Sequence, residues 1–463
     1  MTTAPPRAGW LESLDPTTWR AVRRAALALA AIPVLALVAS RLPNLPGRGV
    51  AGLYGLAVVL STVVLFYLAF VRYRDPALDS AAWIPHRRRD EPLVSFLIPV
   101  NNEVDNIERC VRSVLDSDYR NIELFVVDDG SDDGTAEVLE RLRTVDPRLV
   151  VISLTDRAGK KAALVHAARQ ARGRYFMFTD SDCVIAPDAV GICVGVFRSD
   201  PDIGGLSGHA RALNPDESLL TRVQDVWYDG QFAVAKAAES SFGSVTCVSG
   251  PLAAFRREAI INYLPAWASD HFLGEPFLFA TDRQLTAYVL GQRSVGEALK
   301  ERYAHDPLVT DHDYPVRSWK VVYVRSARVW TNVPPSPGRF VRQQVRWKKS
   351  FIRNVAFNGP WMWRRGPGTS LLYYGHVLWV AIAPLMAFTH LILLPLNGRY
   401  ELTVLYLAGV SLKGAAWACA YRVHNDDTRW VYRPIMTVIS CVLLSWLILW
   451  AAVTVRKPVW SRG

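Results

Sequence analysis

The stretch FTDSDCVI places two aspartates, Asp180 and Asp182, directly after the apolar run 175–178. Two carboxylates this close repel one another, and their burial is costly unless a positive charge lies between them. Carboxylates at positions i and i+2 can converge on one hard divalent cation, and Mg²⁺ usually combines few carboxylates with substrate phosphates. The spacing indicates a site for Mg²⁺ or Mn²⁺ with a diphosphate, but an acidic loop without a ligand has the same pattern.

A second acidic cluster, VVDDGSDDG, contains Asp128 and Asp129 at the end of the strand-like run 124–127. Ligands of open α/β sheets bind at the carboxyl ends of strands, so these carboxylates are well placed to hold a nucleotide. A calcium loop is the alternative, with positions one, three, five, six and twelve at Asp129, Ser131, Asp133, Gly134 and Glu140. That alternative needs a helix immediately upstream, whereas residues 121–127 have the periodicity of a strand.

Two helical patterns begin at charged residues. Lys160 and Lys161 open the pattern over 162–172, where cations and a helix N-terminus suit a phosphate group. Asp282 is a lone carboxylate at the start of a second pattern.

The sequence QQVRW, which begins at Gln343, combines an arginine with an aromatic ring. Arg346 can bind anionic oxygens, and the flat face of Trp347 can stack on a sugar ring. The alternative is an amphipathic interfacial helix whose cations Lys348, Lys349 and Arg353 meet lipid headgroups. The two interpretations are compatible.

The elements that position these residues belong to about 300 residues of soluble composition. Strand-like runs such as 93–100 and 124–127 alternate there with helical patterns. This alternation predicts a mostly parallel sheet covered by helices.

Composition separates this soluble part from apolar flanks. Apolar residues make up 51% of the 463 residues and are unevenly spread, and the net charge of +11 suits an anionic partner. The excess of Lys and Arg follows the apolar flanks rather than one aromatic-laced face, so we expect no nucleic-acid partner. Six cysteines without CxxC spacing give no support for a zinc site or a disulfide framework.

Five apolar stretches approach the roughly 20 residues that a membrane-spanning helix needs. They are residues 25–40, 50–71, 371–394, 402–421 and 435–455. The first could instead be a secretory signal, because arginines precede it and small residues end it. Lys413 lies near the middle of the fourth stretch, where an ammonium group faces a pore or a partner, or else snorkels to the interface.

Charge predicts the topology. Basic residues before the first stretch and after the second place both flanks, and the soluble part, in the cytoplasm. A fifth crossing would put Arg456, Lys457 and Arg462 outside. We therefore expect 435–455 to be re-entrant or interfacial, with a genuine crossing as the alternative.

The order of these motifs resembles that of a known family. DDGS, DSD, an acidic residue before arginine and QxxRW occur in this order in processive, inverting nucleotide-sugar glycosyltransferases, which include cellulose, chitin and hyaluronan synthases. Four longer stretches resemble bacterial hyaluronan synthases in particular, namely residues 219–229, 248–258, 342–351 and 455–462. The likeness covers roughly residues 90–360 well and the membrane parts loosely.

The resemblance implies an α/β, GT-A type (Rossmann-like) cytosolic domain between N- and C-terminal transmembrane helices. On the donor side, Asp128 and Asp129 would recognise uridine, Lys160 and Lys161 would lie near the nucleotide, Asp180 would hold the nucleotide, and Asp182 would hold Mg²⁺ or Mn²⁺. On the acceptor side, Asp282 would be the general base, while Gln343, Arg346 and Trp347 would close over the diphosphate and stack the acceptor sugar. Trp460 is a candidate for gating.

Two positions depart from the family pattern. Ala280 and Thr281 stand where the family usually has an acidic residue, and Ser461 differs within the terminal tryptophan motif. The first departure puts donor or acceptor specificity in doubt, because that position adjoins the reacting hydroxyl.

These inferences predict four regions. Residues 1–74 would form a membrane region with two helices, 75–335 the GT-A domain, 336–370 the interfacial helices and 371–463 a second membrane region. The predicted function is a multi-pass plasma-membrane enzyme that polymerises UDP-sugars and exports the polysaccharide, with hyaluronan from UDP-GlcNAc and UDP-GlcA favoured. Its partners would be the UDP-sugars, the growing polysaccharide and the lipid bilayer. The alternatives are a single-sugar synthase, such as one making chitin oligosaccharides, and a non-catalytic nucleotide-sensing membrane protein.

Overall fold

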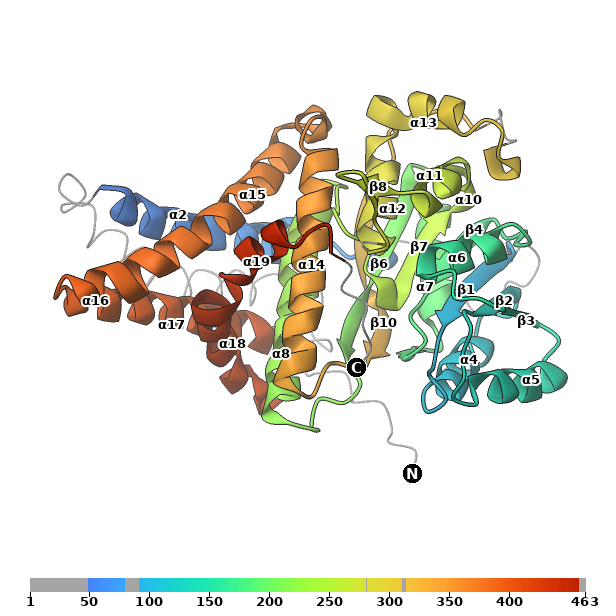
Figure 1. Cartoon of the computed structure of the whole chain (residues 1–463), viewed down its shortest axis with the longest axis horizontal. Coiled ribbons are helices and arrows are strands. Elements are labelled where there is room, and N and C mark those ends of the chain that lie inside the picture. Colours follow the sequence, from blue (N-terminus) through green and yellow to red (C-terminus); the bar gives the residue numbers. More distant parts are fainter. Residues whose placement is uncertain (1–48, 80–90, 280, 310–313, 458–463) are drawn as a thin grey trace. The chain divides into compact units, whose positions relative to one another are not determined.

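The computed structural model describes residues 49–79, 91–279, 281–309 and 314–457 (Figure 1). They form two compact units built from segments distant in sequence. The first unit includes residues 49–73, 216–238 and 378–446, and the second includes 74–215, 239–377 and the chain from 447. The units therefore differ from the four contiguous regions predicted above, because residues 216–238 group with the apolar helices.

The second unit contains an eight-stranded mixed sheet in the order β3-β2-β1-β4-β7-β6-β10-β5. Its parallel half consists of β1 (Val94–Val100), β2 (Ile122–Asp128), β3 (Leu149–Ser153) and β4 (Tyr175–Phe178). The other half consists of β5 (Cys183–Ile185), β6 (Ile203–Ala212), β7 (Ala253–Arg256) and β10 (Lys320–Thr331). There β7 pairs antiparallel with β4 and β6, while β10 runs parallel to β6 and antiparallel to β5.

Helices cover this sheet, as the alternating pattern predicts (Figure 1). The helices of the second unit are α3 (Pro76–Asp79), α4 (Ile107–Leu115), α5 (Thr135–Val145), α6 (Lys160–Ala168), α7 (Ala189–Ser199), α10 (Arg257–Ile260), α11 (Leu264–Ala268), α12 (Thr281–Gly291), α13 (Glu297–Arg302), α14 (Pro337–Asn358) and α19 (Leu447–Val453). Helix α6 packs on β1 and β2, and α7 packs on β6 and β10. The central strands are almost continuously apolar because helices bury both of their faces.

The acidic clusters lie at the carboxyl ends of parallel strands. Asp128 is the last residue of β2, and Asp180 follows the end of β4 by two residues. Since β2 and β4 flank β1 in parallel, both clusters lie at the same edge of the sheet. The calcium-loop alternative for 129–140 is wrong, because strand β2 and not a helix precedes that segment.

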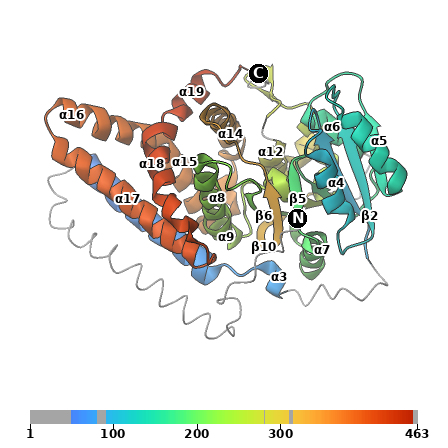
Figure 2. The ribbon, with the colours of Figure 1, turned by 90° about the horizontal axis from the view of Figure 1, so that it is seen from below.

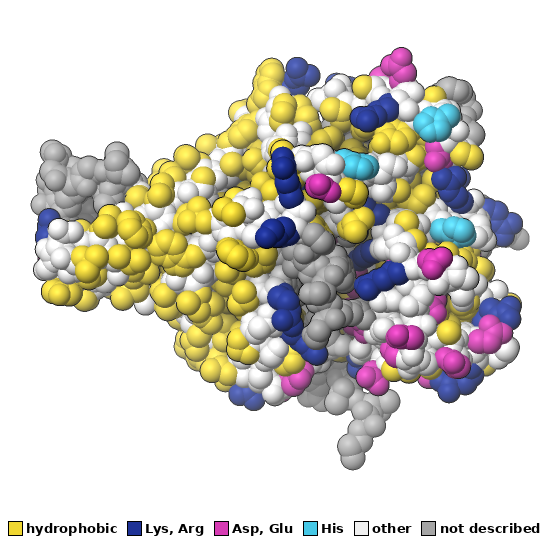
Figure 3. Space-filling model, viewed as in Figure 1, with side chains coloured by type: hydrophobic (Ala, Val, Ile, Leu, Met, Phe, Trp, Pro, Cys, Tyr) yellow, Lys and Arg dark blue, Asp and Glu magenta, His cyan; other side chains and the backbone are white. Residues whose placement is uncertain are grey.

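The first unit consists of helices, most of them apolar. They include α2 (Gly49–Tyr67), α8 (Leu219–Gly230), α16 (Leu394–Leu396), α17 (Tyr400–Arg422), α18 (Arg433–Ile439) and the end of α15 (Pro367–Phe388). Figure 2 shows α17 beside α2, and the two helices contact each other. Hydrophobic side chains gather over α15, α16 and α17 (Figure 3), among them the exposed Leu378, Leu385 and Val404.

Three helical segments of the described chain are long and apolar enough to cross a membrane: Tyr54–Leu78, Pro367–Leu396 and Tyr400–Arg422. They match the second, third and fourth predicted stretches, whereas the first, 25–40, lies outside the described residues. The fifth stretch corresponds to a pair of helical segments, Thr428–Leu444 and Leu447–Val453, with a bend of 41° between them. Such a bend occurs in a broken span or a re-entrant loop.

Lys413 has an aromatic partner within the first unit. Its ammonium nitrogen lies 4.4 Å from the centroid of the Trp379 ring, which in turn stacks on Tyr54 at 4.9 Å. This contact partly offsets the cost of a cation in an apolar bundle.

Candidate active site

The DDG turn after β2 is anchored by its own carboxylates. Asp128 and Asp129 are both buried. Asp128 accepts hydrogen bonds from the main-chain N–H and the hydroxyl of Ser131 at 3.0 and 2.5 Å. Asp129 accepts from the main-chain N–H groups of Ala158 and Gly159 at 2.6 and 2.9 Å. The turn therefore holds the loop that leads into α6 and positions Lys160.

Lys160 and Asp180 form an ion pair through Lys160 Nζ and Asp180 Oδ1. Burial raises the pKa of the Asp180 carboxyl, but Lys160 and Arg346 outweigh it and hold that pKa below its ordinary value. Burial likewise lowers the pKa of Lys160, yet Asp180 and Asp282 raise it overall. The structure thus brings four predicted residues, each from a different motif, into one charged cluster.

Asp182 lies beside this pair. The groups that shift the pKa of its carboxyl include no cation. Burial, Asp180 and Glu103 raise the pKa of the Asp182 carboxyl to about 6. Its Oδ1 receives a long hydrogen bond of 3.4 Å from the Thr331 hydroxyl and a 3.5 Å contact from the Cys183 thiol. A carboxylate whose charge is this poorly balanced is a fitting ligand for a divalent cation.

The protein supplies few metal ligands. No group of three or more His, Cys, Asp or Glu side chains that could hold a metal occurs in the part of the chain that the structure describes. Asp180 and Asp182 together fit a hard cation that takes most of its remaining ligands from phosphate and water.

Asp282 lies in the first turn of α12, next to the same cluster. Its Oδ2 accepts a hydrogen bond from the Gly250 main-chain N–H at 3.2 Å and a contact from the Cys247 thiol at 3.6 Å. Trp267 fixes the start of the helix, because its indole N–H donates to the Thr281 carbonyl at 2.8 Å. The carboxylate is only partly buried, so an incoming hydroxyl can reach it.

Gly250 lies between the two predicted carboxylates, and sequence reasoning missed it. A Cβ at this position would lie 2.9 Å from Oδ2 of Asp180, closer than real Cβ contacts allow. Glycine lets the backbone approach Asp180 without displacing its carboxylate while its N–H reaches Asp282. The sequence feature that could have indicated Gly250 is its place in the stretch VSGPLAAFRRE, which is part of the family resemblance.

The QxxRW motif lies on α14. Arg346 is near enough to Asp180 and Lys160 to shift the pKa of both. Gln343 Oε1 is buried and has no hydrogen-bond partner among the described residues. Arg346 and Trp347 are half-buried. An acceptor such as Gln343 Oε1 is costly to bury unless a ligand or water donates to it.

Lys161 does not join the charged cluster, although the sequence predicts both lysines near the nucleotide. Its side chain is 3% exposed and its Nζ donates to Asp270, to the Phe277 carbonyl and to Gln284. Burial, together with Arg353, lowers the pKa of Lys161 to about 8, although Asp270 opposes this shift. Successive residues of a helix face about 100° apart, and this separates the two neighbours.

Thr281 takes no part in the cluster through its side chain in any contact of the described residues. Thr281 starts α12 and offers its main-chain carbonyl to Trp267. Trp460, the gating candidate, lies outside the described residues, as does Ala280.

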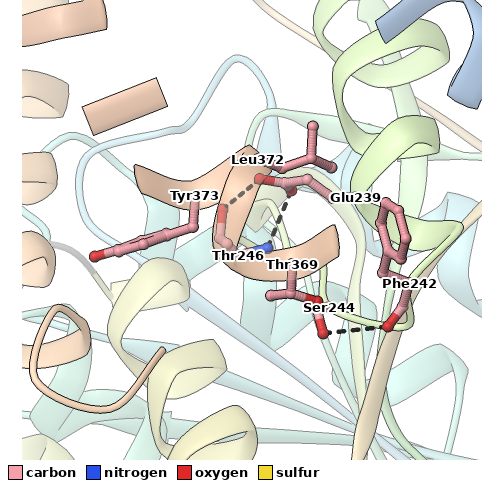
Figure 4. Close-up of a pocket in the computed structure, with 7 residues that line it drawn as sticks. All are labelled: Glu239, Phe242, Ser244, Thr246, Thr369, Leu372 and Tyr373. Atoms are coloured by element: carbon pink, nitrogen blue, oxygen red, sulfur yellow. Dashed lines mark hydrogen bonds between the residues drawn. The ribbon is translucent and has the colours of Figure 1, made fainter. Parts of the chain in front are cut away.

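A small pocket elsewhere in the second unit contains none of the predicted site residues (Figure 4). It is lined by Glu239, Phe242, Ser244, Thr246, Thr369, Leu372 and Tyr373. Glu239 accepts hydrogen bonds there from the main chain and the hydroxyl of Thr246, at 3.1 and 2.8 Å. The carboxylate that lines this pocket is therefore hydrogen-bonded to another residue of the lining.

The mixed sheet places the cluster at the carboxyl ends of its parallel strands, where the ligands of open α/β sheets bind. Residues 95–264 match Glycosyl transferase family 2. This region is thus similar to family 2 glycosyltransferases, and relatives that match the chain over longer stretches are named N-acetylglucosaminyltransferases and hyaluronan synthases.

Three relatives illustrate this kinship. An N-acetylglucosaminyltransferase of Azorhizobium caulinodans is 29% identical over 373 residues, which are 80% of this chain and 87% of the relative. An N-acetylglucosaminyltransferase of Rhizobium meliloti is 32% identical over 276 residues, or 58% of each chain. A hyaluronan synthase of Streptococcus pyogenes is 29% identical over 312 residues, or 66% of each chain. The chain therefore spans less than two thirds of the last two relatives.

Among solved structures, a mannosyltransferase from Pyrobaculum calidifontis in complex with GDP-Man and Mn²⁺ is similar with a TM-score of 0.49. The sequences are 20% identical, and the match covers 86% of this chain and 98% of the other. The predicted fold class is confirmed by the family match and the mixed sheet: an α/β, GT-A type domain with candidate membrane helices on both sides in the sequence.

Proposed function

We propose that this protein is a membrane-embedded, processive and inverting glycosyltransferase that polymerises UDP-sugars and exports the product. The observation that carries the proposal is the cluster around Gly250, where a candidate base, Asp282, lies beside the ion pair of Asp180 and Lys160. A base next to a phosphate-binding cation is what glycosyl transfer to a hydroxyl requires.

In the proposed reaction, Asp282 accepts the proton of the acceptor hydroxyl. The oxygen then attacks the anomeric carbon of the donor, and the bond from that carbon to the diphosphate breaks. Attack from the face opposite the leaving group inverts the configuration. Asp282 is oriented for this role by the N–H of Gly250.

Negative charge accumulates on the leaving diphosphate, and Lys160 and Arg346 are the proposed counter-charges. Their field already holds the pKa of Asp180 below its ordinary value. Asp182, with Asp180, would hold Mg²⁺ or Mn²⁺, which when bound supplies further positive charge to the diphosphate. Asp128 and Asp129 would contact uridine at the adjoining turn. Gln343 and Trp347 would bind the acceptor end.

Hyaluronan, made from UDP-GlcNAc and UDP-GlcA, is the product we favour. Support comes from the streptococcal hyaluronan synthase and from the longer stretches that resemble such enzymes. A single-sugar synthase that uses UDP-GlcNAc is the second candidate, because two of the three relatives described above are named N-acetylglucosaminyltransferases.

We further propose that the enzyme is a multi-pass protein of the plasma membrane with its catalytic domain in the cytosol. The apolar helical segments and the basic residues at their flanks support this orientation. The bundle would then be the route by which the polymer leaves.

The test is sugar incorporation by the purified protein in vesicles with Mn²⁺, using UDP-GlcNAc and UDP-GlcA singly and together. Hyaluronan synthesis predicts a polymer only with both donors, and that polymer is cleaved by a hyaluronan-specific lyase. A product from UDP-GlcNAc alone would favour the second candidate. No incorporation from any UDP-sugar would contradict both.

A further inference from the structure

A buried charge cluster lies beside the site but takes no part in the proposed chemistry. At its centre is Asp270, whose side chain is 3% exposed. Its Oδ2 lies 3.2 Å from Lys161 Nζ. Arg353 donates to both oxygens, from Nε to Oδ2 at 3.1 Å and from Nη2 to Oδ1 at 2.5 Å.

Further hydrogen bonds extend the cluster. Lys161 Nζ donates to Gln284 Oε1 at 2.7 Å and to the Phe277 carbonyl at 2.8 Å. Gln284 is fully buried and donates to the Tyr288 hydroxyl at 2.8 Å. The lysine thereby joins α6, α12 and the hairpin of β8 (His271–Phe272) and β9 (Glu275–Pro276).

Each of the three helices that the cluster joins also carries at least one residue of the proposed active site. Lys161 follows Lys160 on α6, and Gln284 lies two residues after Asp282 on α12. Arg353 lies seven residues, or about two turns, after Arg346 and therefore on a similar face of α14. The cluster thus fixes the relative positions of the helices that carry the base and both proposed phosphate-binding cations.

Stability alone is a weak reason for such an arrangement. Buried ion pairs recover little more than their desolvation cost, and apolar packing of the same volume often stabilises a fold as well. The cluster also holds two cations against one carboxylate. Unlike apolar packing, the cluster makes directional hydrogen bonds. The bidentate pair of Arg353 with Asp270 and the three hydrogen bonds of Lys161 fix angles as well as distances.

We propose that Asp270 is a positioning residue for glycosyl transfer, which holds α6, α12 and α14 in the arrangement that aligns donor, base and diphosphate. This inference rests on the proposed function. A displacement of about 1 Å between reacting groups can slow a reaction by about 100-fold, so loss of Asp270 should affect turnover more than donor binding.

The experiment compares Asp270→Asn, Asp270→Glu and Arg353→Lys in the full chain, with kcat and donor KM measured below each variant's melting temperature. Asp270→Asn is expected to lower kcat by about tenfold or more and to change KM for the UDP-sugar and Kd for UDP by less than about threefold. Asp270→Glu keeps the charge and should recover part of kcat. If Asp270→Asn does not fold, Arg353→Lys, which loses the bidentate geometry, should lower kcat by about threefold or more.

Asp146→Asn is the matched control. It breaks another Asp–Arg pair of the same unit, at 2.7 Å to Arg148, away from the site, and should leave kcat unchanged. The inference is overturned if the folded Asp270 and Arg353 variants keep kcat within about twofold of wild type and lose only thermal stability. Absence of wild-type turnover would instead overturn the proposed function, and the inference with it.

Discussion

The main-chain N–H of Gly250 donates a hydrogen bond to Oδ2 of Asp282 over 3.2 Å. The same glycine leaves no room for a Cβ beside Asp180, whose Oδ2 would lie 2.9 Å from it. One residue at the start of a short 3₁₀ helix, Gly250–Leu252, therefore lies between the proposed base and the carboxylate on the donor side.

Gly250→Ala is expected to impair transfer without unfolding the protein. The added methyl must displace Asp180 or the loop, and such overpacking costs about 1–3 kcal/mol. Displacement of either carboxylate should lower kcat by about tenfold or more. Steady-state sugar transfer and thermal melting measure the two effects. Gly338→Ala is the control, because nothing lies within 4 Å of a Cβ there; equal kcat in the two variants would show that the close approach at Gly250 is unimportant.

Lys160→Met should weaken donor binding. The substitution keeps the length of the side chain but removes the cation that pairs with Asp180 and that would face the diphosphate. A charge-assisted hydrogen bond contributes about 1.5–3 kcal/mol, which corresponds to a rise in Kd for UDP of about 10-fold to 100-fold. Titration calorimetry measures this change.

Lys320→Met provides the comparison for Lys160. It removes an exposed lysine that pairs with Asp200 at 2.9 Å in the same unit, and it should leave UDP binding unaltered. Equal affinities for UDP in the two variants would exclude Lys160 from the donor site.

The shared edge of the sheet was predictable from sequence, because a strand pattern followed by an acidic pair occurs twice and parallel strands end together. The different surroundings of Lys160 and Lys161 were not predictable from sequence. Both residues suit phosphate equally well by type, and only the partner Asp270, 109 residues further along the chain, shows which of them is buried.

Gly250 illustrates a second limit. Its role depends on two carboxylates that lie 70 and 32 residues away, and a lone SGP sequence carries no sign of them. The apolar stretches were easier to predict, since three of the five predicted stretches coincide with candidate membrane spans of the described chain. The bend at residues 445–446 is a matter of backbone geometry, which hydropathy does not encode.

Metal binding should depend on pH through Asp182. Its pKa of about 6 means that the carboxyl is largely protonated at pH 5 and ionised at pH 7. A cation binds the ionised form, so the affinity for Mn²⁺ in the presence of UDP should rise from pH 5 to pH 7 and level off above it. Electron paramagnetic resonance of free Mn²⁺ measures this affinity. UDP itself also titrates, so Asp182→Asn is the reference; parallel profiles for the two proteins would refute the assignment of Asp182.

The most direct test of the proposed mechanism compares sugar incorporation and UDP binding in the wild type and in Asp282→Asn, with Asp306→Asn as a control carboxylate that pairs with Arg169 in the same unit. A general base contributes about 10²–10⁴-fold, so Asp282→Asn should lose that factor in kcat, while UDP binds with nearly wild-type affinity. Asp306→Asn should remain active. Sugar incorporation by Asp282→Asn at the wild-type rate would contradict the assignment of the base. A wild-type protein that binds UDP but transfers no sugar would contradict the proposed activity.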